Sequence, residues 1–168
     1  MSDTTENNSP AVIPTEAGAK KIVNRYVLWS MGAGLVPIPI IDMAAIIAVQ
    51  LKMLSELAKY YDVPFSEEKG KSIVSSLVGG VAAESIAHGS IGSFIKSIPG
   101  AGTLFGMVAM PVSAGATTYG VGKVFTQHFA SGGTLLNFNP DEARDIFNQA
   151  VREGKDVVKN MKSKVKEA

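Results

Sequence analysis

Two long stretches of the chain are almost free of charged side chains. The exceptions are Asp42 in the first stretch, 27–49, and Glu84, Lys96 and Lys123 in the second stretch, 72–124. Uncharged apolar stretches of this length are typical of helices that enter a membrane or fill the core of a helical bundle. The pattern therefore predicts an all-α protein that is organised around these two stretches.

Prolines and glycines interrupt both stretches, so neither can form one straight helix. Pro37 and Pro39 break the first stretch, and Pro99 breaks the second. Each is expected to fold into an apolar helical hairpin, hairpin one over 15–62 and hairpin two over 66–132. The structural candidates at and near their uncharged tips are Pro37, Pro39, Asp42, Pro99, Gly100, Gly102, Gly106 and Pro111.

The two hairpins differ in length. In hairpin one, helices over 22–36 and 40–51 would be about 22 and 18 Å long, which is short of a bilayer core of about 30 Å. In hairpin two, helices over 73–98 and 101–125 would each be long enough to cross, with Pro111 bending the second of them. Hairpin one is therefore expected to insert only partway, whereas hairpin two could span.

Charged segments flank both hairpins. Basic residues precede the first uncharged stretch, separate the two stretches and follow the second, at Lys20, Lys21, Arg25, Lys52, Lys59, Lys69, Lys71 and from Arg144 onward. By the positive-inside rule, these segments belong on the cytoplasmic side, with both hairpins entering the cytoplasmic membrane from there. Both termini are then expected to face the cytoplasm.

Residues 1–14 are polar and acidic and contain two prolines. Such a segment buries too little apolar surface to offset its ordering entropy, so a disordered arm is expected. The arm also lacks the basic start and apolar middle of a secretory signal, and we expect no export.

Small residues recur at four-residue spacing in hairpin two. The pairs are Ser76 and Gly80, Ser85 and Gly89, Gly102 and Gly106, and Ala116 and Gly120. In lipid, small residues allow helix backbones to approach closely. They predict either tight packing within one subunit, which we favour, or the interface of a homo-oligomer.

A C-terminal amphipathic helix is predicted over 139–165. Asn139 is expected to cap its N-terminus, since Pro140 and two acidic residues follow. Asp42 is expected to cap the helix after the first hairpin tip in the same way. The apolar seam of the C-terminal helix contains Phe147, Val151, Val158 and Met161. This seam fits docking on the chain's own first hairpin, which we favour, or a partner helix.

The composition restricts the function further. Sixteen basic and fifteen acidic residues give a net charge of +1, which argues against nucleic-acid binding through overall charge. The chain has no cysteine and two histidines, so disulfides and thiolate nucleophiles are excluded and a metal site is disfavoured. The Gly70–Ser72 sequence lacks the earlier glycine of a phosphate-binding loop, because Phe65 stands there. We expect no enzyme and no cofactor.

One polar pair within the second apolar stretch is a functional candidate. Glu84 and His88 stand four residues apart, on one face of the predicted helix. An ionisable pair inside a membrane can relay a proton or bind an ion. With no third ligand beside it, mutual hydrogen bonding between the two side chains is favoured.

Two ordered sequence signatures resemble a known bacterial family. The first is VPIPIID at 36–42, followed by QLKML at 50–54 and LAKYY at 57–61. The second is IPGAG at 98–102, followed by PVSAGATTYGVGK at 111–123. Together they resemble the YcjF-like family of uncharacterised membrane-associated proteins, whose domain is often fused to or encoded beside GTPase domains.

The resemblance covers roughly 22–132 and implies an α-helical membrane module that serves a GTPase or another partner. No catalytic residue carries over, and a nucleotide switch would have to come from another chain. Our leading hypothesis is a non-enzymatic membrane-associated protein that oligomerises or acts as a scaffold or adaptor for a cytoplasmic partner. The alternative is a soluble, self-assembling helical bundle in the cytoplasm. A third hypothesis is a subunit of an ion or proton pathway that uses Glu84 and His88.

Overall fold

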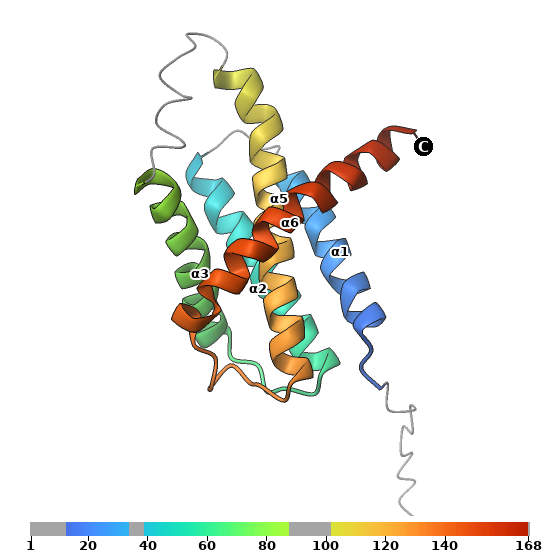
Figure 1. The fold of residues 1–168 in the computed structure, drawn as a ribbon, viewed down its shortest axis with the longest axis vertical. Helices are drawn as coiled ribbons and strands as arrows, with labels where there is room; N and C mark the ends of the chain where they lie inside the picture. The colour runs from blue at the N-terminus through green and yellow to red at the C-terminus, as the bar shows by residue number, and fades with distance from the viewer. Residues whose placement is uncertain (1–12, 34–38, 88–101, 168) are drawn as a thin grey trace, which may run out of the picture.

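The all-α prediction is confirmed by the computed structural model, which describes residues 13–33, 39–87 and 102–167. The described part contains five helices (Figure 1). They are α1 (Glu16–Ala33), α2 (Pro39–Tyr60), α3 (Glu67–Ala87), α5 (Gly102–Ala130) and α6 (Pro140–Glu167).

The first four helices run alternately up and down, and α6 crosses them diagonally (Figure 1). The centre of the bundle is α5, which packs mainly against α6 and α1 and also against α2. By contrast, α3 packs against α2 and α6 and barely touches α5. The two long helices of the second apolar stretch are therefore largely separated by their neighbours.

The bundle has two distinct ends. At one end α1 and α3 stop and α2 and α5 start, and we call this the tip end (Figure 1). At the opposite end, the loop end, the chain connects α2 to α3 through 61–66 and α5 to α6 through 131–139. Both interrupted apolar stretches thus reach the same end of the molecule.

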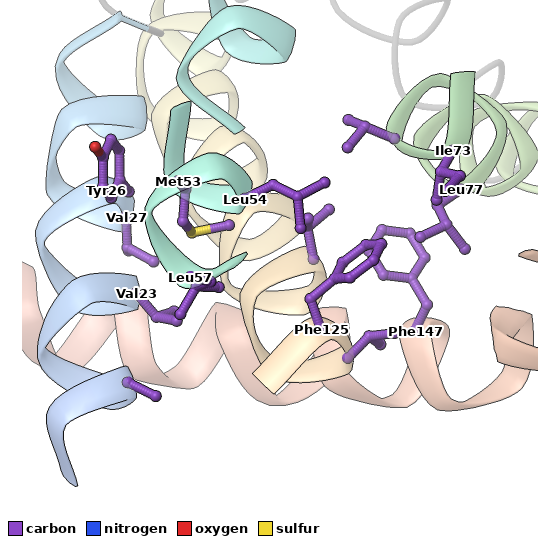
Figure 2. Close-up of a cluster of buried hydrophobic side chains, with 14 of the residues drawn as sticks. Val23, Tyr26, Val27, Met53, Leu54, Leu57, Ile73, Leu77, Phe125 and Phe147 are labelled. Carbon is purple, nitrogen blue, oxygen red and sulfur yellow. The ribbon is translucent and has the colours of Figure 1, made fainter. Parts of the chain in front are cut away.

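The hydrophobic core draws on every described helix. Val27 of α1, Leu54 of α2, Leu77 of α3, Phe125 of α5 and Phe147 of α6 are all buried. Figure 2 shows these side chains converging between the helices. Burial of this apolar surface is the main favourable contribution to folding.

The loop end is closed by two matching helix terminations. After α2, Asp62 has a φ of 56°, its N–H donates to the Lys59 carbonyl, and the Val63 N–H donates to the Ala58 carbonyl at 2.7 Å. After α5, Gly132 has a φ of 83°, its N–H donates to the Phe129 carbonyl, and the Gly133 N–H donates to the His128 carbonyl. Each is a Schellman motif, which satisfies the last carbonyls of the helix.

The capping prediction for α6 is confirmed. The Asn139 side-chain oxygen accepts a hydrogen bond from the Asp141 N–H at 3.1 Å, and the Asn139 amide donates to Glu142 at 2.8 Å. The equivalent prediction for Asp42 is wrong, because α2 already begins at Pro39 and Asp42 lies inside the helix. Proline is favoured in the first turn, where its missing N–H leaves no hydrogen bond unmade.

Helices α5 and α6 approach each other through small residues. A Cβ added at Gly154 would lie 2.8 Å from the carbonyl oxygen of Ala116 and 3.1 Å from its Cα. A Cβ added at Gly120 would lie 2.7 Å from Val151 and 2.9 Å from Phe147. The Ala116–Gly120 pair is therefore occupied by packing within the chain.

Candidate functional site

The predicted tip residues fall in three places. Pro39 is the first residue of α2 and Gly102 the first of α5. Gly106 and Pro111 lie within α5, which continues through the proline. Pro37, Pro99 and Gly100 lie outside the described residues.

Among the residues that the structure describes, no helix is both long and apolar enough to cross a membrane.

The structure describes only one residue of the predicted polar pair, which consists of Glu84 and His88. Glu84 lies in α3, and His88 falls outside the described residues, so their contact stays a prediction. Within the described ranges, no three His, Asp or Glu side chains gather as a metal site requires.

The seam of α6 packs within the chain. Phe147, Val151 and Val158 are buried, and Met161 is half-buried against the same core. Most contacts of α6 are with α5, with fewer to α3. The partner of the seam is thus mainly a helix of the second apolar stretch, whereas we expected the first hairpin or another protein.

Two large apolar side chains are exposed near the tip end of α1. Leu28 is 46% exposed and Trp29 is 54% exposed, although residues on the other face of the same helix are buried. The Trp29 ring lies 5.6 Å from that of Tyr26, centroid to centroid. Adjacent exposed Leu and Trp side chains favour contact with lipid or a partner.

A buried polar cluster joins α1, α2 and α5 inside the apolar bundle. Ser30 and Thr118 lie 2.7 Å apart between their hydroxyl oxygens, and the Gln50 amide donates to Thr118 at 3.2 Å. All three residues are fully buried. The Gln50 carbonyl oxygen is buried without a hydrogen-bond partner. The cluster links three helices at one level of the bundle.

A groove of about 660 Å³ runs between the start of α1, the end of α5 and α6. The Tyr119 hydroxyl donates to Glu153 at 2.7 Å, and the Lys123 ammonium pairs with the same carboxylate. Burial, reinforced by Glu153, raises the pKa of Tyr119 to about 12. Hydrogen bonds from Lys123 and Tyr119 lower the pKa of Glu153. At neutral pH, Tyr119 thus stays protonated and the cluster ties α5 to α6.

A second ionic cluster ties α1 to α2. Arg25 and Tyr26 of α1 both donate to Glu56 of α2, the tyrosine at 2.8 Å. Desolvation favours the protonated form of Glu56, but the hydrogen bonds from Tyr26 and Arg25 outweigh it and lower the pKa of the carboxyl. In both clusters a tyrosine hydroxyl and a cationic side chain converge on one carboxylate.

We expect Glu153→Gln to lower the melting temperature at pH 7 by a few degrees at most, because exposed ion pairs contribute little. The pKa of Glu153 is lowered on folding from 4.5, so its stabilising contribution is complete above about pH 4.5. This contribution is lost as the pH falls through the folded-state pKa. Thermal melts at several pH values should show the two proteins converging in acid.

The control for this prediction is Lys123→Met, which removes the main cause of the lowered pKa. In that background, Glu153→Gln should change the melting temperature at pH 7 less than it does in the wild type. A difference between wild type and Glu153→Gln that persists unchanged at about pH 3 would contradict the assignment.

Sequence reasoning missed the groove. Glu153 lies 34 residues from Tyr119, so only the helix crossing brings them together. One local signal existed, because Tyr119 stands one turn before Lys123, the single Lys, Arg, Asp or Glu residue in α5. The exposed pair on α1 was also missed, although Trp29 is the single tryptophan of the chain.

Comparison with known proteins defines the class to which this all-α bundle belongs. A family model described as "Domain of unknown function (DUF697)" matches residues 9–158. The chain is therefore a member of the DUF697 family.

A named relative comes from Magnetospirillum gryphiswaldense. It is called magnetosome membrane protein 22 and is 38% identical over 163 residues, which cover 97% of this chain and 84% of the relative. No solved structure matches the chain. The finer resemblance to the YcjF-like family, and the link to GTPases that it implies, stay predictions.

Proposed function

We propose that this protein is a membrane-associated helical module without catalytic activity, which meets the bilayer with its tip end. The loop end, where α1 begins and where the loops α2–α3 and α5–α6 lie, then faces the cytoplasm. In this arrangement the bundle presents its groove and the N-terminal half of α6 to a cytoplasmic partner. A GTPase supplied by another chain is the partner that the family resemblance implies.

The observation that carries the proposal is the polarity of the bundle. Both uncharged stretches reach the tip end, where α1 and α3 stop and α2 and α5 start (Figure 1). Charged residues such as Lys59, Asp62 and Lys69 lie at the loop end. A bundle whose four up-and-down helices carry few charges at one end and many at the other suits a boundary between lipid and water.

Two further features support the proposal. Leu28 and Trp29 expose apolar surface near the tip end, and tryptophan is enriched where proteins meet the membrane–water interface. A relative that is 38% identical over 163 residues carries the name of a membrane protein. Scaffolding and self-association are part of the same proposal, because a module without a catalytic site acts through what it binds.

The proposal is tested by fractionating cells that express the full chain, with carbonate extraction of the membrane pellet. We expect the protein to remain in the pellet, and protease added outside spheroplasts should leave tags at both termini intact. A protein recovered in the soluble fraction, which also fails to float with liposomes, would contradict the proposal. It would leave the soluble self-assembling bundle as the function to pursue.

The contribution of Trp29 to membrane binding can be tested separately. We expect Trp29→Ser to weaken liposome binding about tenfold, because the side chain no longer enters the interface. Fold and stability should change little, since the side chain is 54% exposed. Binding is measured by flotation or by co-sedimentation with vesicles.

The matched control is Ile146→Ser on α6. Ile146 is 51% exposed, so the change removes a comparably exposed apolar side chain. It lies in the first third of α6, away from the tip end (Figure 1). Equal weakening by both substitutions would show that general surface hydrophobicity, and not the tip end, drives binding.

A further inference from the structure

The C-terminal half of α6 projects past α1, on the level of the tip end (Figure 1). A Cβ added at Gly115 would lie 2.8 Å from Val158 and 2.9 Å from Met31, so α6 passes the last turns of α1 at Val158. Residues of α6 beyond Val158 therefore continue beside the end of the bundle at which Leu28 and Trp29 are exposed.

This part of α6 is strongly basic. The segment 155–166 contains five lysines and one aspartate, a net charge of +4, whereas the whole chain carries only +1. Lys155, Lys159 and Lys162 follow one another at steps of four and three, so they form a row along one flank of the helix. All three are exposed. Asp156 lies 3.8 Å from Lys159, at the edge of the row.

We propose that this lysine row (Lys155, Lys159 and Lys162) binds the headgroups of anionic phospholipids. The inference rests on the proposed function, and it adds the chemistry of the membrane that the protein selects. The row fits a planar array of phosphates, because it is straight and lies beside the half-buried side chains Val157 and Met161.

The position of the row favours lipid over other anionic partners. A basic helix flank beside exposed apolar side chains is the pattern of a helix that lies on a membrane surface. Leu28 and Trp29 of α1 supply such apolar surface at the same end. Duplex DNA is bound mainly through its phosphates, so it would make little use of the apolar surface beside the row.

The experiment measures binding of the full chain to phosphatidylcholine vesicles and to vesicles that also contain phosphatidylglycerol. We expect wild-type protein to bind the anionic vesicles at least about tenfold more tightly at low salt, with the preference falling as salt is added. The triple variant Lys155→Gln, Lys159→Gln and Lys162→Gln should lose most of this preference. Its binding to neutral vesicles should stay unchanged.

The control variant carries Lys59→Gln, Lys69→Gln and Lys71→Gln. It makes the same change in net charge at exposed positions near the loop end. We expect it to keep the preference for anionic vesicles. An equal loss in both triple variants would assign the effect to net charge and overturn the proposal.

The remaining outcomes separate this inference from the proposed function. Equal binding of wild type to neutral and anionic vesicles would overturn the inference and leave membrane association standing. No binding to either kind of vesicle would overturn both. Salt-sensitive binding to duplex DNA, lost in the first triple variant and accompanied by no vesicle preference, would replace lipid by nucleic acid as the partner of the row.

Discussion

Replacing Phe147 by alanine is expected to lower the free energy of unfolding by about 3–5 kcal/mol. The Phe147 side chain is fully buried where α6 meets α5, and its ring would contact a Cβ placed at Gly120. Figure 2 shows it beside Phe125 and facing the α3 residues Ile73 and Leu77. Its removal leaves a cavity between three helices, and urea unfolding followed by far-ultraviolet circular dichroism would measure the loss.

The neighbouring residue provides the matched control. Ile146 is 51% exposed on the same helix, so Ile146→Ala should change the stability by less than about 0.5 kcal/mol. If both variants unfold at the wild-type urea concentration, α6 does not dock on the bundle in the way that the structure describes.

The second large change in stability is expected for Gly154→Ala. In a helix interior, Gly→Ala normally stabilises by up to about 1 kcal/mol. At Gly154 the added methyl group would lie 2.8 Å from the carbonyl oxygen of Ala116, an atom of the backbone that cannot turn aside. We therefore expect Gly154→Ala to destabilise the protein by about 1–3 kcal/mol, measured by the same urea titration.

Gly79 in α3 supplies the opposite case. A Cβ added there meets nothing within 4 Å, and the residue is exposed. Gly79→Ala should therefore stabilise by about 0.5–1 kcal/mol. Two identical substitutions in two helices should thus change stability in opposite directions, and stabilisation by both would show that α5 and α6 are not in close contact.

Features set by neighbouring residues could be predicted from the sequence. Asn139 caps α6 because the residues that it serves follow within one turn. The break near Pro39 is likewise local, because a proline is favoured in the first turn of a helix and disfavoured further inside it. The cap predicted at Asp42 is wrong because α2 already begins at Pro39, and an acidic residue suits either a cap or the first turns of a helix.

Features set by contacts between distant segments could not be predicted. Nothing in the spacing of Ala116 and Gly120 says whether a helix of the same chain or of another copy fills the gap beside them. The structure shows Phe147, Val151 and Gly154 there. The Tyr119–Glu153 contact and the central place of α5 depend on the same crossing, which no local pattern encodes.

The position of the lysine row is a further feature that depends on contacts between distant segments. The net charge of +1 argues against an electrostatic partner only if charge is spread evenly over the surface. The row at Lys155, Lys159 and Lys162 indicates a lipid-binding surface only because α6 lies beside the tip end. The sequence contains the lysines, but the fold decides what they face.

The hydrogen bonds among Ser30, Gln50 and Thr118 restrict how these helices can slide. Apolar helices rich in small residues can slip past one another by a turn, about 5.4 Å, and still bury similar surface. A slip of α1, α2 or α5 would separate these polar groups and leave them unpaired in an apolar interior, at about 1–3 kcal/mol for each group. The cluster thus specifies a single register, and it holds Trp29 of α1 at a fixed height relative to α2 and α5.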